Sequence, residues 1–118
     1  MLMVDSAFDV PGTLGRLANN KNLYKRLLDK FVAGYSDYEE KISAAFEADD
    51  FESAVQLSHT MKGLAGNLGA EHLHEVSLAL EKIAKSGSKT PEFEDVFEKF
   101  LYELRRALKE AADGVDMG

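Results

Sequence analysis

Residues 49–69 read DDFESAVQLSHTMKGLAGNLG, and this stretch decides the fold. Its apolar side chains recur at steps of three and four residues, a spacing that places them on one face of an α-helix. The helix is expected to begin near Asp49-Asp50, where Asp49 and Glu52 resemble a capping box, and to end at Gly69. Its expected inward face consists of Ala54, Leu57, Met61, Leu64 and Leu68.

Further helical segments lie on both sides of this stretch. One runs from about Asn20 to Ala48, and another follows Gly69 directly and is ended by Ser86-Gly87-Ser88. The last opens at Thr90-Pro91-Glu92, where a capping hydroxyl precedes a proline that suits the first helical position. A shorter segment from Gly12 to Ala18 is expected to form a short helix that covers one end of the others.

Each long segment carries an apolar face of its own. These faces consist of Tyr24, Leu28, Phe31, Tyr35, Tyr38, Ile42 and Ala45; of Leu73, Val76, Leu80 and Ile83; and of Phe93, Phe97, Phe100, Leu101, Leu104 and Leu108. Four amphipathic helices with short connections pack most simply as an antiparallel up-and-down bundle. The sequence therefore predicts an all-α fold, a four-helix bundle with a short additional N-terminal helix. A single domain is expected over residues 1–118, with a core at about 8–112 and short flexible tails.

The composition limits what the chain can bind. Of its 118 residues, 45% are hydrophobic and 30% charged, which suits one domain with one packed core. The net charge of −7 argues against binding to nucleic acids or anionic membranes. The absence of cysteine excludes disulfides, thiolate metal sites and a cysteine nucleophile. Neither a signal peptide nor a membrane-spanning stretch is recognisable, so the expected location is the cytoplasm.

The face opposite the expected core of the central helix carries His59, Lys62, Gly63 and Gly66. This follows from the turn of about 100° per residue in an α-helix. Each glycine inside a helix costs roughly 1 kcal/mol relative to alanine. We interpret both glycines as steric clearance that leaves the imidazole of His59 open to a large partner. The alternative is that Gly63 or Gly66 marks a close contact with a neighbouring helix.

His59 suits nucleophilic chemistry, because a neutral imidazole nitrogen is a good nucleophile near neutral pH. Lys62, three residues further on, is close enough for its ammonium to reach a group attached to the ring. Phosphoryl transfer needs an in-line approach and neutralisation of charge on the outer oxygens, part of which Lys62 can supply. The chain has no phosphate-binding loop, no nucleotide motif and no acidic metal cluster. It is therefore expected to act as a phosphocarrier without autokinase activity, and to bind neither a metal nor a cofactor itself.

Residues 59–69, HTMKGLAGNLG, resemble the His-x-x-Lys-Gly signature helix of the histidine-containing phosphotransfer (HPt) domains of multistep two-component phosphorelays. Residues 17–24 and 27–31 resemble the opening helix of that family, and the likeness extends from about Phe8 to Leu108. The resemblance implies a four-helix bundle with a phosphoacceptor at His59, a phosphate-stabilising lysine at Lys62 and a small residue at Gly63.

The same resemblance also implies the partners. The phosphoryl group would come from the aspartate of one response-regulator receiver domain and pass to that of another. A hybrid sensor histidine kinase is a further expected partner, Mg²⁺ is expected in the receiver rather than in this chain, and the chain is expected to be a monomer.

A competing hypothesis is a helical adaptor or scaffold that binds a signalling partner without covalent phosphorylation. It explains the helices but not the cleared face around His59. Val55, one turn before His59, is either a docking contact for a receiver or packs against a neighbouring helix. His72 and His74 are two residues apart and point to different faces, so no metal site is expected there.

Overall fold

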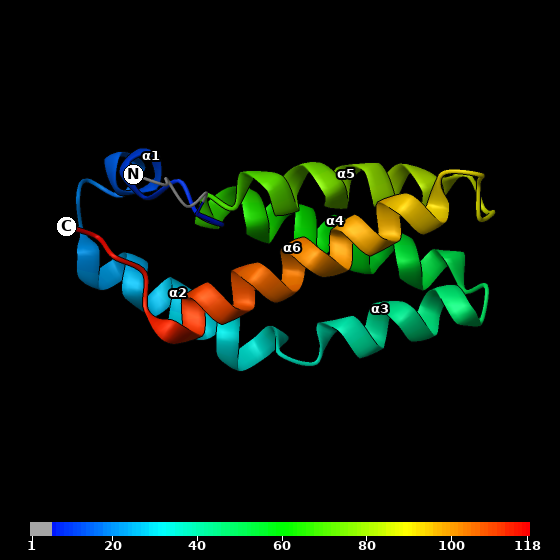
Figure 1. The fold of residues 1–118 in the computed structure, drawn as a ribbon, viewed down its shortest axis with the longest axis horizontal. Helices are drawn as coiled ribbons and strands as arrows, with labels where there is room; N and C mark the ends of the chain where they lie inside the picture. The colour runs from blue at the N-terminus through cyan, green and yellow to red at the C-terminus, as the bar shows by residue number, and fades with distance from the viewer. Residues whose placement is uncertain (1–5) are drawn as a thin grey trace, which may run out of the picture.

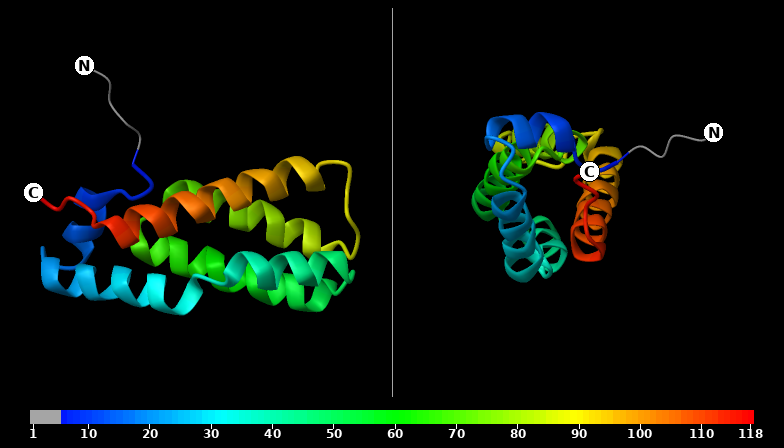
Figure 2. Two further views of the ribbon diagram at one scale, coloured as in Figure 1. Left: turned by 60° about the horizontal axis from the view of Figure 1, so that its bottom comes forward. Right: turned by 90° about the vertical axis from the view of Figure 1, so that its left-hand side faces the viewer.

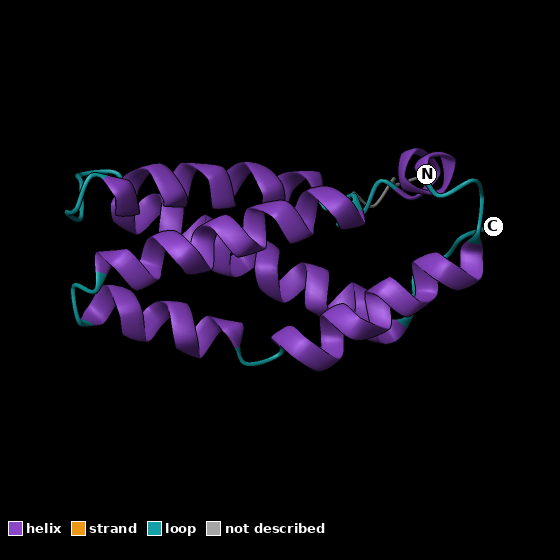
Figure 3. Cartoon of the chain, turned by 180° about the vertical axis from the view of Figure 1, so that it is seen from behind, coloured by secondary structure: helices purple, strands orange, loops and turns teal. Residues whose placement is uncertain are grey.

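The computed structural model describes residues 6–118, and within this range every regular element is a helix (Figures 1 and 3). The helices are α1 (Val10–Arg16), α2 (Lys21–Tyr35), α3 (Tyr38–Glu47), α4 (Phe51–Leu68), α5 (Glu71–Lys85) and α6 (Phe93–Asp113). The prediction of an all-α fold is confirmed for the described residues. None of these helices is long and apolar enough to cross a membrane.

The longer helices lie along the long axis of the molecule, and α1 lies at one end of them (Figure 2). Helix α5 packs against both α4 and α6, while α2 packs on α6 and α3 packs on α4. The chain reverses direction after α3, after α4 and after α5, so these sequence neighbours run antiparallel (Figure 1). This arrangement places α4 between α3 and α5.

One predicted helix is divided in the structure. The segment expected to run unbroken from about Asn20 to Ala48 forms α2 and α3, with Ser36 and Asp37 between them. Short polar side chains such as these are weak helix formers because they compete for backbone hydrogen bonds. The rings of Tyr35 and Tyr38 lie 5.4 Å apart across the break, so the apolar face continues through it.

The two ends of α4 depend on specific residues. The cap is Asp50, whose side chain accepts a hydrogen bond from the amide of Ser53 at 3.1 Å. Asp49 precedes it in a left-handed conformation, with φ of 53°, so the expected cap at Asp49 is wrong by one residue. Gly69 ends the helix as predicted. Its φ is 79°, and a Cβ there would collide with Oγ1 of Thr13 in α1.

The start of α6 also differs from the prediction. Pro91 and Glu92 lie in a turn ahead of the helix, and the amide of Phe93 donates to the carbonyl of Thr90 at 3.0 Å. The hydroxyl of Thr90 is buried without a hydrogen-bond partner in the described part of the chain, so it does not cap the helix. Because proline fixes φ and lacks an N–H, Thr90 and Pro91 shape the turn that leads into α6 and do not cap the helix.

The buried face of α4 is rotated relative to the expected one. It consists of Ala54, Ser58, Met61, Ala65 and Leu68. Leu57 and Leu64, which were expected to point inward, are only half-buried at its edge. Ser58 is small and fully buried, as is Ser77 on α5, so these two helices can pack closely. The rotation turns the side of α4 that carries Lys62 toward α5.

The other predicted inward faces lie in the core or against it. The buried members are Tyr24, Leu28, Phe31, Tyr38, Ile42, Ala45, Leu73, Leu80, Ile83, Phe93, Phe100 and Leu104. After Asp113 the chain leaves the helix, and Val115 and Met117 pack partly against the core. The expected N-terminal tail lies largely in residues 1–5, outside the described part.

Candidate functional site

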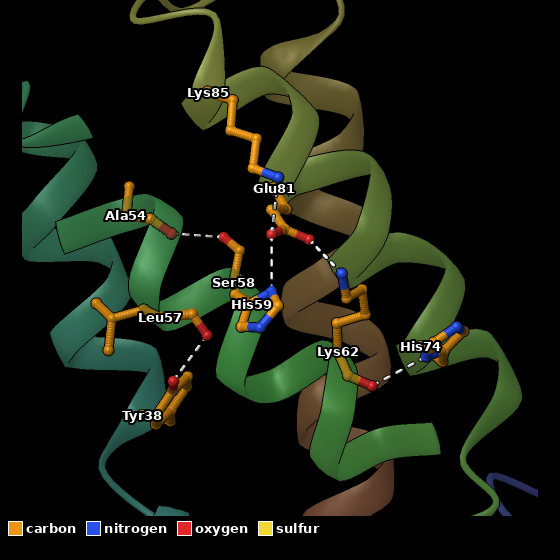
Figure 4. A network of polar contacts seen from close by, with 9 residues as sticks. All are labelled: Tyr38, Ala54, Leu57, Ser58, His59, Lys62, His74, Glu81 and Lys85. Carbon is orange, nitrogen blue, oxygen red and sulfur yellow. Dashed lines mark hydrogen bonds and ion pairs between the residues drawn. The ribbon is translucent and has the colours of Figure 1, made fainter. Parts of the chain in front are cut away.

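His59 stands on the outer face of α4 (Figure 4), and its side chain is 64% exposed. Gly63, one turn further on, is also exposed. A Cβ built there would have no atom of another element within 4 Å. The predicted position of Gly63 on an open face is therefore confirmed, and the imidazole of His59 is accessible from this side.

A buried carboxylate lies next to the imidazole. The side chain of Glu81 on α5 is 3% exposed, and its Oε2 lies 2.9 Å from Nδ1 of His59 (Figure 4). Its Oε1 accepts a hydrogen bond of 2.7 Å from Nζ of Lys62. Lys85, one turn further along α5, places its ammonium 3.3 Å from Oε2. Glu81 was not among the residues that the sequence predicted at this site.

The pKa of Glu81 is lowered from 4.5 to about 2, chiefly by the hydrogen bond from Lys62. Contacts with His59 and Lys85 lower this pKa further, while burial opposes them because desolvation disfavours the charged carboxylate. Glu81 is therefore ionised at neutral pH. One buried negative charge on α5 holds two side chains of α4, and this pairing offsets the cost of burying it.

Lys62 is less exposed than its expected position on the open face beside His59 implies, and its role in phosphate stabilisation stays a prediction. Its side chain is 24% exposed, and its ammonium forms an ion pair with Glu81. The rotation of α4 is the cause, since it directs this side of the helix toward α5. The ammonium nevertheless remains beside the ring, because Lys62 and His59 share the same carboxylate.

Gly66 does not lie on the open face, and the expectation that it does is wrong. It is half-buried against α5, where a Cβ would lie 3.3 Å from Nδ1 of His74. That nitrogen donates a hydrogen bond of 2.9 Å to the backbone carbonyl of Lys62. The alternative interpretation of a close helix contact therefore describes the position of Gly66.

Side chains from three helices hold the backbone of α4. The hydroxyl of Tyr24 on α2 donates to the carbonyl of Leu68, and that of Tyr38 on α3 donates to the carbonyl of Leu57, each at 2.7 Å. His74 supplies the corresponding bond from α5. The helix that presents His59 is thus fixed from several directions, which favours a defined orientation of the site.

Two further expectations concern Val55 and metal binding. Val55 is half-buried and packs against the core, which agrees with the packing alternative, and its docking role stays a prediction. Among residues 6–118, no three or more His, Asp or Glu side chains are grouped so that they could hold a metal ion.

Comparisons with known proteins give two matches. A family model described as the Hpt domain matches residues 26–114. Among solved structures, the chain is similar to histidine-containing phosphotransfer protein B (HptB) from Pseudomonas aeruginosa PAO1, with a TM-score of 0.78 and 22% sequence identity. That match covers 93% of this chain and 95% of the other, and at this identity it establishes a shared fold. A search of curated protein sequences finds no significant match.

Proposed function

Since the chain belongs to the Hpt domain family and is a histidine phosphotransfer intermediary of phosphorelays, we propose that His59 is its phosphoacceptor. The observation that carries this proposal is the exposed imidazole on the outer face of α4, next to the open position of Gly63. The protein is a phosphocarrier. We infer that it takes the phosphoryl group from the aspartate of one receiver domain and passes it to the aspartate of another.

The transfer forms one bond and breaks one. A ring nitrogen of His59 donates its lone pair to the phosphorus of an aspartyl phosphate. The bond from phosphorus to the carboxylate oxygen breaks, and the carboxylate leaves with the electron pair. The same displacement in reverse, with a second aspartate as nucleophile, releases the group from His59. In-line displacement needs free access to phosphorus, which the exposed ring and Gly63 provide.

Lys62 is proposed to stabilise the outer oxygens of the transferring group. Its ammonium lies beside the ring but is paired with Glu81, so the incoming phosphoryl group competes with that carboxylate. A contribution of roughly 1–2 kcal/mol follows, which corresponds to a tenfold to thirtyfold effect on rate. Gly63 is proposed to keep the approach to His59 clear.

The expected partners are response-regulator receiver domains and a hybrid sensor histidine kinase. Mg²⁺ is proposed to reside in the receiver, and no autokinase activity is expected, because the sequence contains no nucleotide-binding loop. We also expect a monomer located in the cytoplasm, and the net charge of −7 argues against binding to nucleic acid.

We further propose that α2 with α3, α4, α5 and α6 form the four arms of an antiparallel bundle, with α1 as the additional helix. The alternating chain direction and the shared core support this description.

Transfer from a radiolabelled, phosphorylated receiver domain tests the assignment. The wild-type protein should acquire acid-labile, base-stable label, whereas His59→Gln should remain folded and unlabelled because His59 is exposed. His72→Gln, which changes an exposed histidine of α5, is the matched control and should label normally. Full labelling of His59→Gln would refute the site. Receiver binding without any labelling of the wild type would favour the adaptor hypothesis instead.

A further inference from the structure

Basic residues are concentrated in one segment of this acidic chain. Residues 16–30 contain a single acid and five basic residues, which are Arg16, Lys21, Lys25, Arg26 and Lys30. The segment therefore carries a net charge of +4, and because the whole chain carries −7, the other residues together carry −11. The last four of these basic side chains belong to α2, and all four are exposed. We call these four residues the basic face of α2.

The basic residues of this segment also differ from the others in their surroundings. Outside residues 16–30, every Lys and Arg except Lys82 forms an ion pair with a carboxylate. Within the segment, no ion pair to any residue in the range 6–118 is formed, and Arg16 and Lys21 donate only to neutral oxygens. A neighbouring carboxylate cancels much of the field of a cation. The charge on the basic face of α2 is therefore available to attract an anionic partner.

One side of the basic face adjoins the part of α4 that carries His59. Helix α2 packs against α6 and α4. Lys21 and Lys25 line a surface cavity together with residues at the end of α6, so they lie on the flank of α2 toward α6. Lys30 is about 180° around the helix from Lys21, on the flank toward α4. The tyrosine hydroxyls of α2 and α3 bind α4 at the two ends of residues 57–68, and Lys30 lies between these tyrosines in the sequence. It is therefore level with the stretch that contains His59.

We propose that the basic face of α2 steers the phosphorylated receiver toward His59, and that the receivers this chain serves have an acidic surface beside their phosphoaspartate. This inference rests on the proposed function, since it names the kind of receiver that reaches the site. The reacting group of a receiver is itself anionic, and carboxylates are the usual ligands of the Mg²⁺ proposed there.

The charge of the rest of the chain makes such steering necessary. An acidic receiver is repelled by a molecule of net charge −7 unless a positive field lies close to the point of contact. Electrostatic steering raises association rates by roughly tenfold to a thousandfold and weakens as salt is added. Receivers with an acidic surface would thus be selected by their rate of encounter, before any chemistry at His59.

The triple variant Lys25→Gln/Arg26→Gln/Lys30→Gln removes the unpaired charge. It should fold, because the three residues are exposed and glutamine has a similar helix propensity. The probe is an acidic, phosphorylated receiver domain that labels the wild type. At low salt the second-order rate constant of transfer should fall at least about tenfold, while the maximal rate at saturating receiver should stay within about twofold. The difference should vanish near 1 M salt, where the Debye length is about 3 Å.

Lys89→Gln/Lys99→Gln/Lys109→Gln is the matched control. It lowers the net charge by the same amount, but each of its lysines is paired with an aspartate. Its second-order rate constant should change by less than about threefold. An equal fall in both triple variants would show that net charge, rather than the basic face of α2, controls the encounter.

The wild type alone also tests the proposal. A second-order rate constant that does not fall as salt rises would overturn the steering role even if the first triple variant does not fold. Labelling only by receivers whose surface is neutral or basic would overturn the choice of partner. If transfer is unchanged in that variant, and the wild type but not the variant binds phosphatidylglycerol vesicles, the face contacts a membrane instead. These outcomes leave His59 as the acceptor, whereas labelling of His59→Gln would refute the proposed function.

Discussion

Two glycines three residues apart in α4 have different surroundings. A Cβ at Gly63 would meet no atom of another element within 4 Å, whereas one at Gly66 would lie 3.3 Å from Nδ1 of His74. Each glycine lowers helix stability by about 1 kcal/mol relative to alanine. Packing accounts for this cost at Gly66. At Gly63 nothing in the described part of the chain accounts for it, which leaves access to His59 as the explanation.

Substitution of Gly63 should therefore separate stability from transfer. Gly63→Ala should raise the free energy of unfolding by up to about 1 kcal/mol, because alanine restores helix propensity on an open face. Gly63→Gln should also fold, but its side chain lies one turn from His59, where the receiver approaches. Since a misplacement of about 1 Å can cost a hundredfold in rate, transfer should slow at least about tenfold. Thermal unfolding and transfer kinetics measure the two effects.

Gly34 provides the control for this experiment. It lies inside α2, is exposed, and a Cβ there would likewise meet nothing within 4 Å. Gly34→Ala and Gly34→Gln should therefore fold without any effect on transfer. Unfolding of Gly63→Gln would contradict the open position of Gly63, and normal transfer by that variant would contradict its role in clearance.

The residues of the site differ in how far the sequence could reveal them. The outward positions of His59 and Gly63 follow from helical spacing alone. The burial of Glu81 does not, because acidic residues in helices are mostly exposed and this one is covered only by packing against α4. A signal is nevertheless present. Ser77 and Glu81 are one turn apart on the buried face of α5, so an acid continues a face that packs inward.

At the scale of helices, the contact between α4 and α5 sets the geometry of the site. His74 and Glu81 are seven residues apart, which places them on the same side of α5. His74 donates to the backbone carbonyl of Lys62, and Glu81 binds the ammonium of the same residue (Figure 4). The apolar spacing of α4 did not predict this register. It favoured Leu57 and Leu64 as inward residues, whereas close packing with α5 selects the smaller side chains.

The role of Gly66 in this contact predicts a difference between two alanine variants. Gly66→Ala should gain less stability than Gly63→Ala by about 0.5–1.5 kcal/mol, because its Cβ disturbs the hydrogen bond that His74 donates. In a His74→Ala background the two substitutions should become nearly equivalent, which a double-mutant cycle in urea can measure. Equal gains at both positions in the wild-type background would show that Gly66 is not needed for the contact.

For the molecule as a whole, the apolar faces were sufficient to predict an all-helical fold and most of its core. The break at Ser36 and Asp37 and the late start of α6 were missed, because local backbone preferences within a continuous apolar pattern decide them. The sequence also does not show how burial shifts the pKa of tyrosines that bridge helices. Burial is the largest cause that raises the pKa of Tyr38 to about 12, and burial likewise raises that of Tyr24.

These shifts, together with that of Glu81, predict how stability depends on pH. The lowered pKa of Glu81 contributes stability above its ordinary value of 4.5, and this is lost as the pH falls toward 2. A raised tyrosine pKa has the opposite sign. It contributes stability below the ordinary value of 10, and for Tyr38 this is lost as the pH rises toward 12. The fold should therefore lose stability at both low and high pH. Near neutral pH, the ionisation of Glu81 and Tyr38 should not make its stability depend on pH.

The variant Tyr38→Phe isolates the alkaline part of this dependence. It removes the hydrogen bond of 2.7 Å to the carbonyl of Leu57, so it should lower the free energy of unfolding at pH 7 by about 0.5–1.5 kcal/mol. Above about pH 10, the free energy of unfolding should fall less steeply in this variant than in the wild type. The reason is that one group that resists ionisation in the folded state is gone, while Tyr24 still contributes to the fall. Urea unfolding at several pH values measures both effects.

Tyr102→Phe, which changes a tyrosine that is 61% exposed, is the control and should alter neither the stability at pH 7 nor its dependence on pH above 10. If the free energy of unfolding of Tyr38→Phe falls with pH as steeply as that of the wild type, ionisation of Tyr38 is not coupled to unfolding.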